Sequence, residues 1–253
     1  MENNSPKIYR FKSLTSTNQE LNDLNKSDSI PEFSVVVASE QTAGRGQMGN
    51  SWESEPGKNL TFSIIIRPSF LPIQQQFRIT QVITLALVRL LNPLLKNVSI
   101  KWPNDVYCDD KKIAGILVEN SLKGDKIEYS IIGVGLNVNQ EIFRSNAANP
   151  VSLKQLTKQD FDIYELLNQL IVHFVEIYSD WKVERNDEWL HKNYMENLYR
   201  KNGIHPFKDS HGKFYATIAE IKPSGHLILQ TKSGNFRTYA FKEVSFETPK
   251  QTS

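Results

Sequence analysis

The chain has 253 residues, of which 39% are hydrophobic and 23% charged, as is typical of a folded protein with one large domain or a large and a small one. Its single cysteine, Cys108, excludes a disulfide scaffold and a cysteine-rich zinc site. Thirty basic against 28 acidic residues leave a formal net charge of +2, which does not favour a nucleic-acid partner.

The sequence carries no sign of membrane insertion or secretion. Its longest apolar runs, such as Phe62–Ile66 and Ile83–Val88, are far shorter than the ~20 residues that cross a bilayer. Residues 1–4 have neither the basic nor the apolar region of a secretory signal. We therefore expect a cytoplasmic protein without a membrane partner.

Short strands separated by polar, glycine-containing loops dominate the first half of the chain. Apolar residues from Ile79 to Leu90 recur with i, i+3, i+4, i+7 spacing, which predicts one helix among these strands. We therefore expect an α+β fold, a mixed sheet with helices packed on one face. Runs rich in β-branched residues predict strands at Ser34–Ala38, Asn59–Arg67, Val98–Lys101, Ile113–Glu119 and Glu128–Val134.

The second half changes from helices to strands near Gly203. Apolar spacing predicts helices at about Phe161–Tyr178 and Trp181–Tyr199. We expect a catalytic domain over residues 1–200 and a small all-β domain over residues 201–253. Glycine-containing turns separate the three strands predicted in the second domain, Lys213–Ile221, His226–Gln230 and Phe236–Phe241.

A glycine-rich loop follows the first predicted strand. Gly44, Gly46 and Gly49 lie within six residues and allow backbone N–H groups to approach a ligand closely. Arg45 can place two donors on a phosphate or carboxylate, and Trp52 offers a stacking surface. The spacing excludes a Walker A loop, and no helix signal follows as in a Rossmann motif. Taken alone, the loop fits a structural turn as well as a binding site.

Two later segments place polar side chains at strand ends. Lys101 to Tyr107 contains a Pro-Asn-Asp turn, and Lys112 opens the apolar strand that follows. Gly115 within that strand leaves room for a ligand or another backbone. Asn137 follows the next strand. The segment from Lys101 to the strand after Lys112 also fits a plain hairpin with a solvated, charged turn, and Asn137 alone is a weak signal.

In order and spacing, these segments together resemble the biotin protein ligases. The resemblance covers about residues 8–140, and residues 203–248 resemble the SH3-like C-terminal domain of that family. It implies a class II synthetase-like catalytic domain. The motifs that carry it are Ser16-Thr17-Asn18, Gly44-Arg45-Gly46-x-x-Gly49-x-x-Trp52, Pro56-Gly57 with Asn59-Leu60, Lys101-Trp102-Pro103-Asn104-Asp105, Lys112-Ile113-Ala114-Gly115-Ile116-Leu117-Val118-Glu119 and Gly135-Leu136-Asn137-Val138-Asn139.

The resemblance implies an enzyme that activates biotin with ATP and Mg²⁺ as biotinyl-5′-AMP and transfers it to a lysine of a biotin carboxyl carrier protein. It implies no protein-borne metal site, and the catalytic residues would be Arg45, Lys112 and Asp105. Biotin would contact Ser16, Thr17, Asn18, Gln41, Arg45, Gly46, Gln47, Lys112 and Gly115. The nucleotide would contact Gly44, Gly49, Trp52, Asn59 and Asn137.

Two loop positions depart from the family pattern. Many family members carry a second arginine where this chain has Gln47, and another commonly basic position is Asn50. Fewer cations over the phosphate lead us to expect weaker retention of the acyl-adenylate than in arginine-rich relatives.

Two alternatives remain at this stage. A lipoate-type acyl ligase or acyltransferase shares the fold by resemblance, although the Gly-Arg-Gly loop and the Lys-Trp-Pro-Asn-Asp segment favour biotin. A biotin-responsive regulator would carry a helix-turn-helix ahead of Ser16, and the 15 residues there are too few for one. We therefore expect no nucleic-acid partner. Exposed sheet edges permit a homodimer, but the sequence does not require one.

Overall fold

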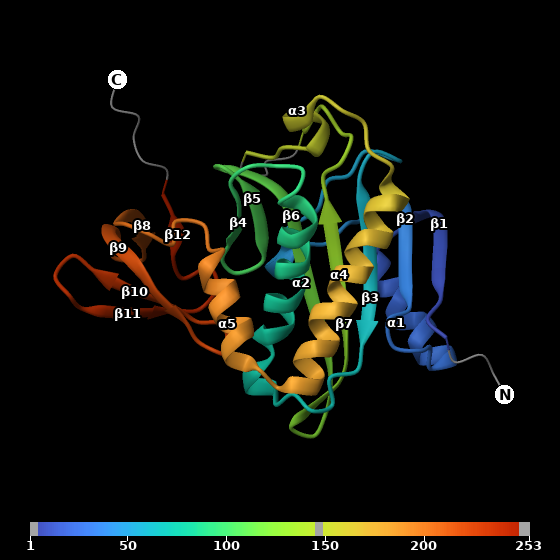
Figure 1. The fold of residues 1–253 in the computed structure, drawn as a ribbon, viewed down its shortest axis with the longest axis horizontal. Helices are drawn as coiled ribbons and strands as arrows, with labels where there is room; N and C mark the ends of the chain where they lie inside the picture. Colours follow the sequence, from blue (N-terminus) through green and yellow to red (C-terminus); the bar gives the residue numbers. More distant parts are fainter. Residues whose placement is uncertain (1–4, 145–148, 248–253) are drawn as a thin grey trace.

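The centre of the molecule is a seven-stranded sheet, in the order β1-β2-β3-β7-β6-β5-β4 (Figure 1). The computed structural model describes residues 5–144 and 149–247, so the four N-terminal residues, where no secretory signal is predicted, lie outside it. The β1–β2 pair is parallel and the other pairs are antiparallel, so the predicted mixed sheet is confirmed. The strands are β1 (Ile8–Leu14), β2 (Val35–Gln41), β3 (Leu60–Ile66), β4 (Val98–Lys101), β5 (Asp105–Cys108), β6 (Lys111–Lys123) and β7 (Lys126–Leu136).

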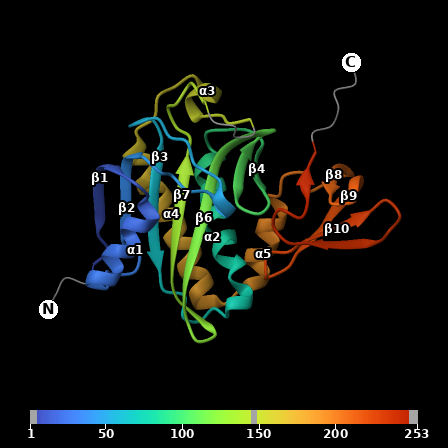
Figure 2. The same cartoon turned by 180° about the vertical axis from the view of Figure 1, so that it is seen from behind.

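Helices cover both faces of this sheet. Helices α2 (Phe77–Leu91) and α4 (Ile163–Glu184) lie on one face, and α1 (Thr17–Asp28) lies on the other (Figures 1 and 2). Strand side chains alternate, so Val36 packs with Leu21 of α1 while its neighbours pack into the main core. The expectation of helices on one face only is therefore wrong. Helix α1 has few apolar residues and so gives no clear helical spacing.

The boundary between the last two helices differs from the prediction. Helix α4 continues to Glu184 and α5 covers Asp187–Glu196, so the break lies six residues later than expected. Arg185 adopts a left-handed conformation with φ of 54°, which ends α4. The Asn186 side chain then accepts a hydrogen bond of 2.8 Å from the Trp189 amide and caps α5.

Three short helical segments connect the larger elements. Ser152 and Gln155 form a reciprocal capping box at the start of the shortest α-helix, α3 (Leu153–Thr157). Two 3₁₀ turns, at Gln47–Gly49 and Ile73–Gln75, lie in loops. Within the described ranges, no helix is both long and apolar enough to cross a bilayer.

The C-terminal segment forms a separate antiparallel sheet in the order β11-β10-β9-β8-β12, which confirms the predicted all-β unit. The Trp102 indole, in the β4–β5 turn, donates a hydrogen bond of 2.8 Å to the Gly225 carbonyl of this unit. Trp102 also packs edge-on against Phe241 at 6.2 Å between ring centres. The unit is thus docked beside the β4–β5 hairpin, while domain limits at residues 200 and 201 stay a prediction. Its strands are β8 (His205–Asp209), β9 (Gly212–Ile221), β10 (Leu227–Thr231), β11 (Phe236–Tyr239) and β12 (Ser245–Phe246).

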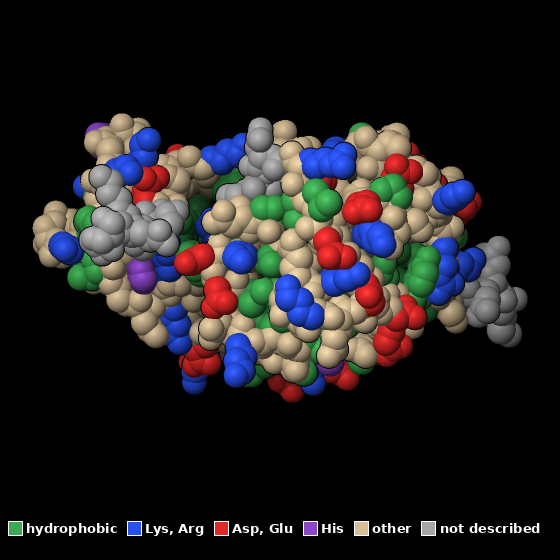
Figure 3. Space-filling view, turned by 90° about the horizontal axis from the view of Figure 1, so that it is seen from above, with side chains coloured by type: hydrophobic (Ala, Val, Ile, Leu, Met, Phe, Trp, Pro, Cys, Tyr) green, Lys and Arg blue, Asp and Glu red, His purple; other side chains and the backbone are tan. Residues whose placement is uncertain are grey.

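Acidic and basic side chains are interspersed over the face shown in Figure 3. This mixture agrees with the small net charge of the sequence. Neither sign dominates the described part of this face, so it offers no broad electrostatic footprint for a polyanion.

Candidate active site

A cavity of about 520 Å³ opens on the α1 face of the central sheet, next to the C-terminal sheet. Its volume lies within the range of small-molecule sites. Segments far apart in the sequence form its wall: the start of α1, the glycine-rich loop, the β4–β5 hairpin, the first half of β6, the end of β7, and the C-terminal segment between residues 241 and 246.

The floor of the cavity is made of glycines. Gly115 on β6 pairs directly with Gly135 on β7, and Gly133 follows the same face of β7. A Cβ atom on Gly135 would overlap the Trp52 indole, and one on Gly133 would overlap the Asn18 amide. The absence of side chains at these positions therefore makes room for both Trp52 and Asn18.

One end of the cavity carries a buried network of hydroxyls and amides. The Gln41 Oε1 atom accepts hydrogen bonds from the Thr17 amide at 2.8 Å and from the Thr17 hydroxyl at 3.1 Å. Ser63 on β3 bonds the Thr17 hydroxyl at 2.7 Å and the Asn18 Oδ1 atom at 2.5 Å. Residues from α1, β2 and β3 thus hold each other in fixed orientations. Ser63 is fully buried and was not predicted as part of the site.

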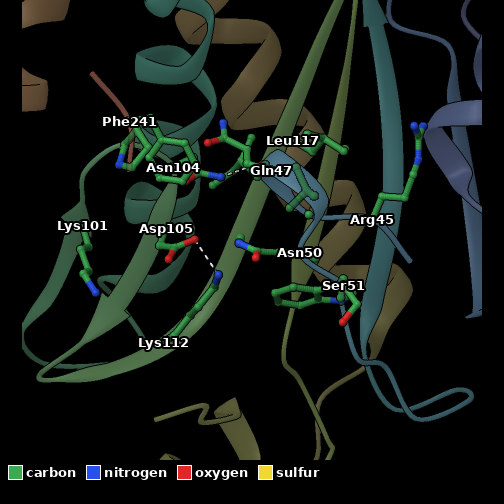
Figure 4. A pocket seen from close by; sticks show the side chains of 18 of the residues that line it. Arg45, Gln47, Asn50, Ser51, Lys101, Asn104, Asp105, Lys112, Leu117 and Phe241 are labelled. Carbon is green, nitrogen blue, oxygen red and sulfur yellow. Dashed lines mark hydrogen bonds and ion pairs between the residues drawn. The ribbon is translucent and has the colours of Figure 1, made fainter. Parts of the chain in front are cut away.

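A lysine and an aspartate form an ion pair across the cavity from this network. The Lys112 Nζ atom lies 2.7 Å from the Asp105 Oδ1 atom, and each side chain is about one-fifth exposed (Figure 4). The Lys112 Nζ atom also lies 5.7 Å from the centre of the Trp52 ring. Strands β5 and β6 pair antiparallel here, with a bulge between Val106 and Tyr107. The hairpin therefore brings together two residues that lie seven positions apart.

Arg45 reaches the same cavity but points away from Lys112 (Figure 4). Its guanidinium forms an ion pair of 3.1 Å with Glu119 on β6. The same Glu119 oxygen accepts a hydrogen bond of 2.7 Å from the Asn18 side chain. Glu119 therefore links the glycine-rich loop to the polar end of the cavity, an interaction that the sequence did not predict.

Comparison with known proteins places this chain in one family. Residues 10–137 match the description "Biotin/lipoate A/B protein ligase family". The bifunctional ligase/repressor BirA of Bacillus subtilis is 30% identical over 233 residues, which cover 90% of this chain and 70% of that protein. The chain belongs to the biotin/lipoate A/B protein ligase family.

Two further similar proteins match most of the length of this chain. The biotin–[acetyl-CoA-carboxylase] ligase of Paracoccus denitrificans is 29% identical over 216 residues, which cover 79% of this chain and 85% of that protein. A solved structure of the Aquifex aeolicus biotin protein ligase in complex with biotin and ATP superimposes with a TM-score of 0.78. It is 26% identical, and the match covers 96% of this chain and 99% of that one.

Most of the predicted site residues of this chain line the cavity described above. Asn59 and Asn137 do not, because their amides support backbone: Asn59 accepts from the Val138 amide at 3.0 Å, and Asn137 donates to the Val151 carbonyl at 3.0 Å. Gly44 and Gly49 also lie outside the wall. As nucleotide ligands these four stay predictions. The predicted residues that do line the cavity are Ser16, Thr17, Asn18, Gln41, Arg45, Gly46, Gln47, Trp52, Asp105, Lys112 and Gly115.

The C-terminal unit contributes a wall that the sequence analysis missed. The C-terminal residues that line the cavity follow Asp105 by more than 130 positions in the sequence. No local spacing indicates which turn of the small sheet meets the cavity. Lys101 and Trp102, quoted only as parts of a motif, also line it. The C-terminal residues of the wall are Phe241, Lys242, Val244, Ser245 and Phe246.

The described residues offer no ready-made metal site. They contain no group of three or more histidine, cysteine, aspartate or glutamate side chains placed to hold an ion. Asp105, a carboxylate of the cavity wall, is already paired with Lys112. A divalent cation in this cavity would therefore need oxygen ligands from a bound substrate.

Proposed function

We propose that the protein is a biotin–protein ligase. It joins biotin to ATP as biotinyl-5′-AMP and then transfers the biotinyl group to a lysine of a biotin carboxyl carrier protein. The observation that carries this proposal is a cavity with an amide and hydroxyl network at one end and the Lys112–Asp105 pair at the other. Biotin has the same division, since its ureido group is polar and neutral and its distant carboxylate is charged. The names of the relatives support the choice of substrate.

Activation of biotin requires positioning more than covalent chemistry. The ureido group would bond Thr17, Asn18 and Gln41, and the Lys112 ammonium would hold the carboxylate beside the α-phosphate. A carboxylate oxygen attacks the α-phosphorus, the bond to the β-phosphate oxygen breaks, and pyrophosphate leaves with the electron pair. No proton is transferred, so Lys112 acts by neutralising charge in a site sheltered from water.

Mg²⁺ would enter this cavity with the nucleotide. The described residues provide no cluster of protein ligands, so the phosphate oxygens of ATP would coordinate the ion. In this proposal Mg–ATP is the substrate, and Lys112 supplements the charge of the ion.

Transfer to the acceptor requires a neutral amine. The acceptor lysine is charged near neutral pH and must lose a proton before it attacks the acyl carbon. We assign that proton to the Asp105 carboxylate, which lines the cavity beside Lys112. The amine nitrogen then attacks the acyl carbon, and AMP leaves with the electron pair of the broken anhydride bond. The attacking nitrogen loses its second proton to the departing phosphate as the amide forms, and Asp105 releases the first proton to solvent.

The proposal is tested by ATP–pyrophosphate exchange, followed by labelling of a purified carrier domain. We expect exchange that depends on biotin, and label from biotin on the carrier lysine. Lipoate is the matched control because other family members use it. Exchange with lipoate and none with biotin would replace this proposal with the lipoate-ligase alternative. A cytoplasmic location stays a prediction, and exposed sheet edges permit a homodimer without requiring one.

Replacing Gln47 with arginine is expected to slow the release of biotinyl-AMP by about tenfold or more, since a charge-assisted hydrogen bond to phosphate exceeds a neutral one. Gln47 lines the cavity within the glycine-rich loop. Release is measured by loading the enzyme with radiolabelled biotin and ATP and chasing with unlabelled intermediate. Gln159→Arg adds the same charge at an exposed position and should leave release unchanged. An unchanged rate in Gln47→Arg would refute the expected weak retention.

A further inference from the structure

Lys101 is a second lysine of the cavity wall, at the end of β4. Its Nζ atom donates a hydrogen bond of 2.9 Å to the Tyr107 hydroxyl. The same atom lies 4.7 Å from the centre of the Tyr107 ring and 5.6 Å from that of Phe246. Asp105, its direct cross-strand neighbour, forms its ion pair with Lys112 instead. Across residues 5–144 and 149–247, no carboxylate forms an ion pair with Lys101.

The partners of Lys101 are neutral. Burial, with further contributions from Asp105 and Tyr199, raises the pKa of the Tyr107 phenol, so this group stays protonated at physiological pH. Lys101 is half-buried, and burial lowers the pKa of its ammonium; Asp105 opposes this effect, whereas Lys112 adds to it. A partly desolvated ammonium held by a phenol and two ring faces still lacks a counter-charge. A bound anion would supply one.

The order of strands indicates which anion reaches Lys101. The polar network joins the start of α1 to β2 and β3, Lys112 lies on β6, and Lys101 lies on β4. Figure 4 shows Lys112 and Lys101 on opposite sides of Asp105 in this view. Two strand spacings, about 10 Å of sheet, separate the strands of the two lysines. A ligand that extends from the network past Lys112 therefore continues toward Lys101.

Phosphoryl transfer places the attacking and leaving oxygens roughly in line. In the proposed reaction the biotin carboxylate approaches from the side of the polar network and Lys112. The leaving oxygen then points along the sheet, away from that network and toward β4. As the bond to the α-phosphorus breaks, this oxygen takes the electron pair and gains negative charge. A fixed ammonium near it stabilises that charge without a proton transfer.

We infer that Lys101 binds the β- and γ-phosphates of ATP and the pyrophosphate that leaves, an inference that rests on the proposed function. The Tyr107 hydroxyl and the Phe246 ring of the C-terminal unit hold the ammonium in place. Lys101 is thus a phosphate-binding residue distinct from Lys112, which faces the carboxylate and α-phosphate. The small C-terminal sheet contributes to the site because its Phe246 ring lies beside the Lys101 ammonium.

The test measures biotin-dependent ATP–pyrophosphate exchange in Lys101→Met, which retains the length and apolar stem of the side chain. We expect the half-saturating concentration of pyrophosphate to rise by about tenfold or more, because a charged hydrogen bond to the anion is lost. Half-saturating biotin should change by less than about twofold. Lys101→Arg restores the charge and should recover most of the affinity for pyrophosphate.

Lys96→Met is the matched control, because Lys96 is an exposed lysine just before β4. It should behave as the wild type, and thermal unfolding and biotin binding of Lys101→Met should show that the fold is intact. Unchanged half-saturation for pyrophosphate, or an equal loss of affinity for biotin, would overturn the inference. A wild-type protein without biotin-dependent exchange would instead overturn the proposed function, so the two failures are distinguishable.

Discussion

Replacing Lys112 with methionine is expected to reduce biotin-dependent ATP–pyrophosphate exchange by about 10²–10³-fold, the usual cost of removing one charge-stabilising donor from a transition state. The proposal places this ammonium beside both the biotin carboxylate and the α-phosphate, so its loss leaves two anionic groups facing each other. Initial rates of exchange at saturating biotin and ATP measure the effect. Retention of more than about a tenth of the wild-type rate would contradict the assignment.

Two further variants separate this effect from damage to the ion pair. Lys112→Met leaves the Asp105 carboxylate without the partner that lies 2.7 Å away. The double variant Lys112→Met with Asp105→Asn removes that unpaired charge and should stay as inactive as the single variant. Recovery in the double variant would show that the lone carboxylate, and not the missing ammonium, caused the loss. Lys111→Met alters the exposed neighbour on β6 and should exchange normally.

Site residues could be predicted where they belong to short sequence motifs that resemble those of a known family. The resemblance to the biotin protein ligases predicted that Gln41, Arg45 and Lys112, which lie in different segments of the sequence, act in one place. The structure brings all three to the same cavity wall. Local spacing cannot, however, predict side-chain partners. Arg45 therefore faces Glu119, a pairing that depends on how β6 and the loop pack in three dimensions.

The fold was predicted best where apolar spacing is strong, and least well where tertiary packing supplies the stability. Helix α2 is buried along nearly its whole length and was expected from its spacing. In helix α1, Leu21 is the one apolar residue that is buried, and the other buried residues, Thr17, Asn18 and Asn25, are polar. Such a helix is stabilised mainly by the sheet it packs on, which the local sequence does not reveal. The C-terminal wall of the cavity could not be predicted from local sequence either, because it also depends on tertiary packing.

Replacing Asp105 with asparagine is expected to impair the second half-reaction selectively. Transfer from preformed biotinyl-AMP to the carrier lysine should fall by about 10²–10⁴-fold, the usual contribution of a positioned base. Exchange should fall by less than about tenfold, because asparagine still offers Lys112 an oxygen acceptor. Single-turnover labelling of a carrier domain measures transfer. Asp180→Asn, on an exposed position of α4, is the matched control and should leave both half-reactions unchanged.

The dependence of transfer on pH distinguishes a base from a residue that only orients Lys112. Without the carboxylate, transfer depends on the fraction of acceptor lysine that is neutral in solution, which rises about tenfold per pH unit below its pKa of about 10.4. The variant should therefore regain rate steeply between about pH 7 and about pH 9. In the wild type Asp105 takes the proton from the bound ammonium, so transfer should vary little over that range. Equal slopes in the two proteins, or equal losses in both half-reactions, would leave Asp105 as an orienting partner of Lys112 and remove it from the proton transfer.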